Sequence, residues 1–321
     1  MEVLAETQNI RKCYAKSNLF TARKAQVSAV NGVSLRIEKG RSVGLVGESG
    51  SGKSTLGRMM AGLETPTEGQ AFFREQPISH LSLKKMRPFR RDIQMIFQNS
   101  ASAFDRSYTI GESIAEVIRN SESVTSKECM LRVHSILEQV GLDSAYARRN
   151  PQELSGGQRQ RANIARALVL HPEFVVCDEP VSSLDYSLRK QILTLLNNLR
   201  NRFGLTYLFI THDLHSVPYV CDTLVIFYAG KVMEQIDLNR YSMQDVLHPY
   251  TRLLLSAVPA REPANRKKGM AESILDTTVL PDYRRCCRFF PRCSCGTEQC
   301  RQEEPRLKEI ACGHFVACHI E

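Results

Sequence analysis

Short apolar runs bounded by polar turns alternate with stretches of helical spacing along most of the chain. Three runs that are nearly continuous in apolar residues lie at 42–46, 174–178 and 207–210. Strands covered on both faces of a sheet have this composition. Residues 99–165 are mostly helical in pattern, and another amphipathic helix is expected from about 187 to 203. The pattern therefore predicts an α/β fold.

The turn after the first run has the spacing of a phosphate-binding loop: Gly, four residues, then Gly-Lys-Ser. Its residues are Gly47, Glu48, Ser49, Gly50, Ser51, Gly52, Lys53, Ser54 and Thr55. Apolar positions at helical spacing from 56 to 63 place this loop between a strand and a helix. Lys53 can reach the β- and γ-phosphates of a nucleotide, and the Ser54 hydroxyl can bind Mg²⁺. A glycine-rich turn with a solvated lysine is the alternative, and the strand–loop–helix context favours the nucleotide site.

Polar side chains also leave the ends of other predicted strands. Asp178 and Glu179 end the run at 174–178, where Asp178 suits Mg²⁺ and Glu179 suits polarisation of an attacking water. Capping of the next helix is the alternative role for these acids. If the sheet is parallel, His212 leaves its strand on the same side as Glu179, and Gln98 emerges from a strand expected at 93–97.

Two further features are ambiguous on spacing alone. Ser155, Gly156, Gly157 and Gln158 open a helix, where serine is a good N-cap and the glycines admit an anion, so the pattern favours neither role. Tyr14 suits either an adenine ring or half-buried packing.

Composition limits the class of protein. With 321 residues, 42% hydrophobic and 24% charged, the chain is typical of a globular protein of one large domain plus an appendage, or of two domains. No run approaches about 18 apolar residues, and the start of the chain resembles no signal peptide, so we expect a cytoplasmic protein. The net charge of +9 includes a basic cluster at 84–91, but no nucleic-acid motif accompanies it. A solvated surface near anionic lipid or phosphate is expected there.

Cysteines are unevenly distributed. Seven of the 11 lie near the end of the chain: Cys286, Cys287, Cys293, Cys295, Cys300, Cys312 and Cys318. Without secretion a disulfide framework is disfavoured, and thiolate ligation of a metal is preferred over free thiols. The spacing matches neither the short ferredoxin run nor paired zinc modules.

Together these residues resemble the ATP-binding subunits of ABC transporters, over roughly residues 1–258. The matching motifs are the Walker A loop 47–55, the Q-loop Gln98, the signature 154–158, Walker B 174–178 followed by Glu179, the D-loop 183–185 that ends at Asp185, and the H-loop His212. Tyr14 resembles the adenine-stacking residue of this family. The resemblance implies a P-loop NTPase cassette with a mixed sheet and a helical subdomain at about 99–165.

The resemblance also implies a mechanism with ATP and Mg²⁺. Two cassettes close head to tail, so that Ser155, Gly156 and Gly157 of one face the γ-phosphate held at the other's Lys53. Gln158 and Asp185 belong to the same nucleotide-binding set. Glu179 orients or deprotonates water, His212 contacts the γ-phosphate, and Gln98 senses Mg²⁺ and the membrane subunit, while Ser54 and Asp178 hold the ion.

The end of the chain resembles one branch of this family. Residues 248–259 are similar to the segment that ends the cassette in oligopeptide, dipeptide and nickel importers. Residues 259–321 are similar to the small, irregular, cysteine-rich extension of the peptide-permease branch, in which four cysteines bind a [4Fe–4S] cluster. Carried over, these are Cys287, Cys293, Cys300 and Cys318. We expect such a site to cross-link a tail too small to build its own core.

The resulting hypothesis is a peripheral ATPase on the cytoplasmic face of the bacterial inner membrane that energises a di- or oligopeptide importer. Its expected partners are a second ATP-binding subunit, commonly a paralogue, two transmembrane permease subunits and an extracytoplasmic substrate-binding protein, with no nucleic acid. A nickel or metal-chelate importer is the alternative within the family. From other classes, a soluble ABC protein lacks support because no second cassette or coiled-coil insertion is present, and an iron–sulfur redox sensor stays open.

Overall fold

A computed structural model of the chain describes residues 2–16, 25–98, 103–257 and 286–319. Its centre is an eight-stranded sheet in the order β11-β12-β10-β9-β3-β8-β7-β6. The strands are β3 (Ser42–Val46), β6 (Ile93–Ile96), β7 (Phe174–Asp178), β8 (Thr206–Thr211), β9 (Thr223–Tyr228), β10 (Lys231–Asp237), β11 (Lys308–Ala311) and β12 (His314–Val316). The five strands from β9 to β6 are parallel, and the other three are antiparallel. The predicted mixed sheet is confirmed.

The central strands are apolar because both of their faces are covered. On β7, Val175 and Cys177 point into one hydrophobic cluster, whereas Phe174 and Val176 point into the other. Successive side chains of a strand alternate between the faces of its sheet, so a doubly covered strand needs apolar residues at every position. This explains why the runs in the sequence are continuous rather than alternating.

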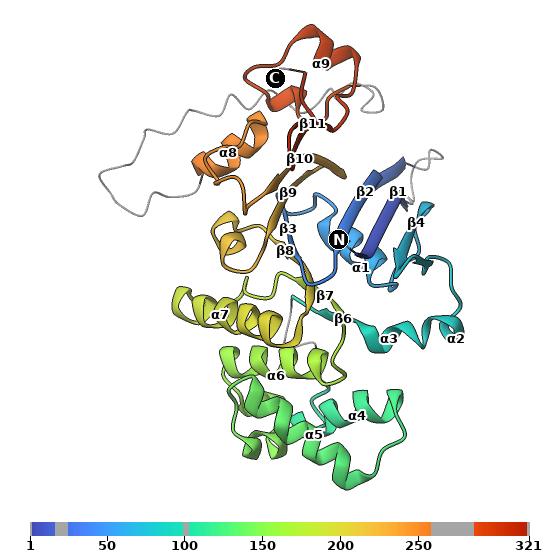
Figure 1. Cartoon of the computed structure of the whole chain (residues 1–321), viewed down its shortest axis with the longest axis vertical. Coiled ribbons are helices and arrows are strands. Elements are labelled where there is room, and N and C mark those ends of the chain that lie inside the picture. The colour runs from blue at the N-terminus through green and yellow to red at the C-terminus, as the bar shows by residue number, and fades with distance from the viewer. Residues whose placement is uncertain (1, 17–24, 99–102, 258–285, 320–321) are drawn as a thin grey trace.

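A second, antiparallel sheet covers one of these faces. Its order is β2-β1-β4-β5, with β1 (Val3–Lys16), β2 (Ala25–Glu38), β4 (Glu68–Phe73) and β5 (Gln76–Pro77). Helix α1 (Lys53–Met60) lies beside this sheet (Figure 1) and buries Leu56, Met59 and Met60 between the two sheets. Leu63 was expected on the same helical face, but α1 ends before it and Leu63 is 44% exposed. The left-handed φ of +65° at Gly62 turns the chain away there.

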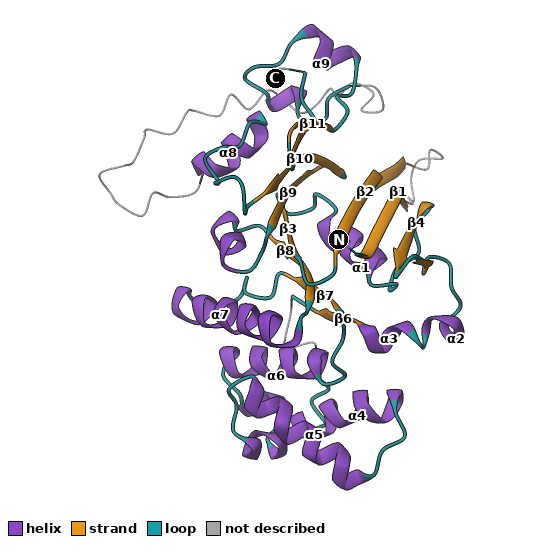
Figure 2. Cartoon of the chain, in the orientation of Figure 1, coloured by secondary structure: helices purple, strands orange, loops and turns teal. Residues whose placement is uncertain are grey.

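Helices cover the opposite face and continue below it (Figure 2). Helices α6 (Gly156–Leu168) and α7 (Tyr186–Phe203) pack on the sheet, while α4 (Ile110–Ser121) and α5 (Ser126–Gln139) pack against α6 as a helical subdomain. Shorter elements are α2 (Leu83–Met86), α3 (Phe89–Asp92), η1 (Ser144–Arg148), η2 (Pro151–Glu153) and η3 (Leu214–Tyr219). Among the described helices, none is both long and apolar enough to cross a membrane.

The C-terminal extension is less irregular than the sequence suggested. Besides α8 (Pro249–Ala257), which precedes it, the extension contains η5 (Phe290–Arg292) and α9 (Glu298–Gln302), and its strands β11 and β12 continue the central sheet. Cys287, Phe289 and Cys300 join the core of the cassette. The extension therefore has no need of a separate core, because it docks on an existing one.

A buried carboxylate fastens this junction. Glu234 of β10 has no solvent exposure. It accepts hydrogen bonds from the backbone N–H groups of Leu247 (2.7 Å) and His248 (3.2 Å) and from the Thr251 hydroxyl, and it lies 2.8 Å from Nε2 of His314 on β12. A buried charge of this kind is tolerated only when its oxygens are fully paired. These contacts hold α8 and β12 against the sheet edge.

Candidate functional site

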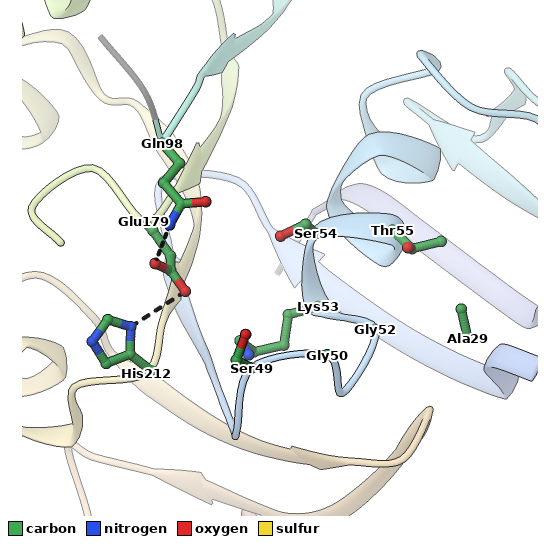
Figure 3. A pocket seen from close by; sticks show the side chains of 10 residues that line it. All are labelled: Ala29, Ser49, Gly50, Gly52, Lys53, Ser54, Thr55, Gln98, Glu179 and His212. Atoms are coloured by element: carbon green, nitrogen blue, oxygen red, sulfur yellow. Dashed lines mark hydrogen bonds and ion pairs between the residues drawn. The ribbon is translucent and has the colours of Figure 1, made fainter. Parts of the chain in front are cut away.

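A cavity of about 510 Å³ lies at the carboxyl edge of the parallel strands, where an α/β sheet presents its ligands. The phosphate-binding loop follows β3, Gln98 follows β6 after one residue, Glu179 follows β7 and His212 follows β8. The residues that line the cavity are Ala29, Ser49, Gly50, Gly52, Lys53, Ser54, Thr55, Gln98, Glu179 and His212 (Figure 3). Groups predicted from four separate segments of sequence thus meet in one place.

The loop fits its surroundings only because glycine occupies two positions. A Cβ atom at Gly47 would lie 2.0 Å from the carbonyl oxygen of Phe227, and one at Gly52 would lie 2.0 Å from that of Ala29. Gly52 also has a φ of +102°, which other residues rarely adopt. Backbone from β9 and β2 therefore presses on the loop from outside, which holds the loop's shape.

Lys53 lies inside this loop and is only 4% exposed. Its Nζ donates hydrogen bonds to the carbonyl oxygens of Gly47 (2.8 Å) and Glu48 (2.7 Å). Burial lowers the pKa of this ammonium, and the nearby charges of Glu179, Asp178 and Glu48 act in the opposite direction. A buried lysine at the start of a helix, surrounded by loop N–H groups, is suited to binding an anionic phosphate.

The two residues expected to hold Mg²⁺ are in contact. The Ser54 hydroxyl donates a 2.8 Å hydrogen bond to Oδ1 of Asp178. Adjacent oxygen ligands of octahedral Mg²⁺ lie about 3 Å apart, so this pair of hard oxygen donors fits the ion. Burial raises the pKa of Asp178, with Glu179 adding to the effect, while Ser54, Arg58 and Lys53 oppose it. A cation bound here would relieve the cost of burying the carboxylate.

Glu179 is held between two side chains. Nε2 of Gln98 donates to its Oε2 at 2.7 Å, and Nδ1 of His212 lies 3.3 Å from its Oε1, as the dashed lines in Figure 3 show. Its backbone has a φ of +47°, and its N–H donates to the carbonyl of Ile210 at 2.9 Å. Left-handed backbone at a non-glycine residue is costly and is concentrated at functional sites. The arrangement aims one carboxylate into the cavity.

The signature residues do not line this cavity. The Ser155 hydroxyl caps α6 by accepting a hydrogen bond from the Gln158 N–H (3.3 Å). In turn, Oε1 of the Gln158 side chain accepts a hydrogen bond from the Ser155 N–H (3.0 Å). Ser155 and Gly156 are exposed, whereas Gly157 is buried against Leu188. Asp185 accepts from the N–H of the same Leu188 and so caps α7. Within this chain Ser155 and Asp185 are helix caps, and the exposed N-terminus of α6 lies outside the cavity lining.

Tyr14 lies beside the cavity without lining it. The side chain is half-exposed on β1, and its hydroxyl donates to Glu64 and lies 3.5 Å from Oγ1 of Thr55. Lys12 lies over its ring at 5.3 Å. The sequence did not indicate Ala29, which reaches the cavity from β2 of the other sheet; no local motif marks it.

The cysteines of the extension do not form a recognisable metal site. Across residues 286–319 and the other described segments, no three or more His, Cys, Asp or Glu side chains are grouped so as to hold a metal ion. Cys287, Cys300 and Cys318 are buried and Cys293 is half-buried. Burial raises the pKa of the Cys287 thiol to about 11, and nearby Cys300 and Cys293 add to this. The structure does not support the predicted [4Fe–4S] cluster, which stays a prediction.

Known proteins resemble both parts of the chain. A family model described as ABC transporter matches residues 30–182, and one described as the C-terminal region of oligopeptide/dipeptide transporters matches residues 241–300. The oligopeptide transport ATP-binding protein AppF of Bacillus subtilis is 41% identical over 99% of this chain and 98% of its own length. The dipeptide transport ATP-binding protein DppF of Haemophilus influenzae is 38% identical over 97% and 95%.

Solved structures agree with these matches. The ATP-binding cassette MJ0796, solved as a dimer in a post-hydrolysis state bound to ADP and phosphate, superposes with a TM-score of 0.66 at 28% identity. The match covers 73% of this chain and 99% of that one. The cassette cbiO1 of Clostridium perfringens has a TM-score of 0.64 at 24% identity and supports the fold.

Proposed function

The chain belongs to the ATP-binding proteins of ABC transporters, and on that premise we propose that it binds and hydrolyses ATP to energise an importer of di- or oligopeptides. The observation that carries the proposal is the convergence of Lys53, the Ser54–Asp178 pair and Glu179 on one cavity. Relatives of nearly the same length are named oligopeptide and dipeptide transport ATP-binding proteins. The names support the peptide class, and the cavity supports the chemistry.

Binding of the triphosphate replaces contacts that the loop makes with itself. Phosphate oxygens take the place of the carbonyls of Gly47 and Glu48 at Nζ of Lys53, and loop N–H groups donate to the same anion. Ser54 and Asp178 would hold Mg²⁺, and the ion would supply positive charge to the phosphate oxygens. Positioning and charge stabilisation then supply most of the rate enhancement.

Glu179 is the residue we assign to the attacking water. Its carboxylate orients the water and accepts its proton as the new P–O bond forms and the bond to the leaving ADP oxygen breaks. Gln98 and His212 keep that carboxylate in place through one oxygen each. His212 is half-exposed at the rim, where it can reach the γ-phosphate.

The exposed N-terminus of α6 supports a paired arrangement. Ser155, Gly156 and Gly157 would complete the cavity of a second ATP-binding subunit, together with Gln158 and Asp185, rather than their own. The match to a cassette solved as a dimer supports this step. We infer that the second subunit is a paralogue, and that Tyr14 stacks on the adenine once the nucleotide is bound.

The remaining partners follow from the same class of transporter. We infer two transmembrane permease subunits, a substrate-binding protein outside the membrane and a peripheral position on the cytoplasmic face. Residues 1–258 are proposed as the ATP-binding domain and 259–321 as the extension; the boundary falls among residues outside the described ones. Import of nickel or a metal chelate is the alternative within this family.

The iron–sulfur site is a separate proposal with one supporting feature. The four cysteines carried over from the peptide branch lie in a single small lobe. Protein purified without oxygen should contain iron and be brown. Colourless protein with stoichiometric zinc, or without metal, would reject the cluster.

The test of the function uses the assembled transporter in lipid vesicles. With ATP on the side of the ATP-binding subunits, labelled di- or oligopeptides should accumulate, and Lys53→Ala in this chain should lower the rate by at least about tenfold. Uptake of a nickel chelate without uptake of peptides would replace the peptide assignment by the alternative. Peptide uptake at the same rate with and without ATP would reject the proposal that this chain energises the transporter.

A further inference from the structure

The C-terminal lobe (residues 286–319) contacts the phosphate loop directly. Nη1 of Arg292, at the end of η5, lies 2.9 Å from Oε2 of Glu48, more than 240 residues earlier in the chain. Glu48 is the first of the four residues between Gly47 and Gly52, the two glycines of the phosphate-loop motif. An arginine of the C-terminal lobe thus pairs with a side chain of the phosphate-binding loop.

An aromatic cluster fixes the position of this arginine. The Arg292 guanidinium lies 5.7 Å from the ring centroid of Tyr228 and 5.9 Å from that of Phe289. These two rings meet edge to face at 5.5 Å, and Tyr250 of α8 lies 4.6 Å from Tyr228. Cation–π contacts add to the ion pair and restrict the rotamers of the arginine. Arg292 is therefore presented to Glu48 from a rigid base.

Two further contacts connect the same region to the loop. The Glu48 N–H donates to the Tyr250 hydroxyl at 3.1 Å, so both the backbone and the side chain of Glu48 are held from the C-terminal side. Arg288 donates to the carbonyl of Ala229, and the neighbouring Gly230 N–H donates to the carbonyl of Ser51 at 2.9 Å. The lobe thus contacts the loop directly at Glu48 and reaches Ser51 only indirectly, through residues 229 and 230.

The charge of Glu48 matters because of what lies next to it. Glu48 is one of the carboxylates whose charge acts on buried Lys53, and the Glu48 carbonyl accepts a hydrogen bond from Nζ of Lys53. A triphosphate brings several negative charges to this place. An unpaired carboxylate beside it would repel the ligand, and a paired one would not.

We propose that Arg292 is a positioning residue of the phosphate loop, which raises the affinity for ATP by pairing with Glu48. Arg292 does not line the cavity, so its effect falls on binding and leaves the chemical step unchanged. This inference rests on the proposed ATP site and adds that the C-terminal lobe helps to set its affinity. Changes in the packing of residues 287–293 are then transmitted to nucleotide binding through Arg292.

The test measures MgATP affinity of the full-length chain by calorimetry. Because the pair is half-exposed, Arg292→Glu should weaken binding by a moderate factor, about three- to tenfold. Arg301→Glu is the matched control: it reverses a charge on exposed α9 of the same lobe, and its affinity should stay within about twofold of the wild type. In the assembled transporter, Arg292→Glu should raise KM for ATP by a similar factor and leave kcat nearly unchanged.

A charge swap distinguishes pairing from general damage. Glu48→Arg combined with Arg292→Glu should bind ATP more tightly than Arg292→Glu alone, because the two charges again attract. If Arg292→Glu does not fold, Arg292→Gln at low and high salt replaces it, and its deficit should shrink as salt screens the charge of Glu48. Wild-type affinity in Arg292→Glu, or a loss in kcat alone, would overturn the proposal. Absence of binding by the wild-type chain would instead reject the ATP site itself.

Discussion

At the scale of single residues, the position of Glu179 is fixed by three neighbours that come from three segments of the chain. Gln98 and His212 each hold one oxygen of its carboxylate, and the Ile210 carbonyl holds its N–H. Its left-handed φ directs the side chain toward the cavity rather than along the next helix. The hydrogen bond to strand β8 and the contacts of the side chain offset the cost of this backbone conformation. The site is therefore preorganised around the position of one carboxylate.

Glu179→Gln should leave MgATP binding intact and lower the ATPase turnover of the assembled transporter by about 100-fold or more, because an amide accepts no proton from water. The glutamine keeps the size of the original side chain, but one of its two terminal atoms becomes a hydrogen-bond donor instead of an acceptor. Glu138→Gln makes the same chemical change on exposed α5 and serves as the control. A turnover equal to that of the wild type would remove Glu179 from its assigned role.

The sequence allowed most residues of the cavity to be predicted, because each is local to a strand end or a loop with its own motif. Lys53, Ser54, Gln98 and His212 were expected at a nucleotide site and line the cavity, and Asp178 contacts Ser54. Ala29 was not expected, because it comes from a different sheet and its position depends on how the two sheets pack. Contacts made by tertiary packing leave no local pattern.

At the scale of elements, the phosphate loop has two glycines that both adopt positive φ but differ in their surroundings. A Cβ at Gly50, with a φ of +77°, would meet nothing within 4 Å, whereas one at Gly52 would meet the Ala29 carbonyl at 2.0 Å. The shape of the loop thus depends partly on the left-handed backbone that glycine permits and partly on the neighbouring strand β2. The two contributions can be separated.

Gly52→Ala should lower the free energy of unfolding by about 2–4 kcal/mol, because a methyl group cannot coexist with the backbone of Ala29. Gly50→Ala is the matched control and should cost only about 1–2 kcal/mol, the cost of left-handed backbone without a clash. Denaturant titration of the full-length chain measures both. Equal losses in the two variants would show that β2 does not constrain the loop.

Element boundaries were predictable where the apolar pattern is strong. The helix expected from about 187 to 203 is α7, and the strand at 207–210 lies within β8. The helix after the phosphate loop ends earlier than its apolar spacing indicated, because Gly62 takes a left-handed turn. An apolar residue at helical spacing just beyond a C-cap, such as Leu63, cannot be distinguished in sequence alone from a residue of the helical face.

At the scale of the whole molecule, the C-terminal lobe is part of the cassette's architecture. It extends the central sheet through β12, shares the main core through Phe289 and is locked by the Glu234 network. The sequence resemblance indicated the lobe's family but not its docking, because β12 pairs with β10 across some 80 residues of chain. Long-range strand pairing of this kind has no local signal.

The arrangement of the whole chain also explains why some of the sequence motifs line the cavity and the signature motif does not. Residues that follow β3, β6, β7 and β8 meet in one cavity, whereas the N-terminus of α6 stays exposed. A site that is complete for binding and open on one side is suited to closure by a second subunit. The proposed function therefore predicts that the single chain binds ATP and that turnover needs the assembly.

The most direct test is equilibrium binding of ATP to the intact chain with and without Mg²⁺, compared with Lys53→Ala. The account predicts that Mg²⁺ increases the affinity of the wild-type chain, because Ser54 and Asp178 hold the ion beside the phosphates. Lys53→Ala should lose at least about tenfold in affinity. A wild-type chain with no magnesium-dependent affinity for ATP would contradict the account.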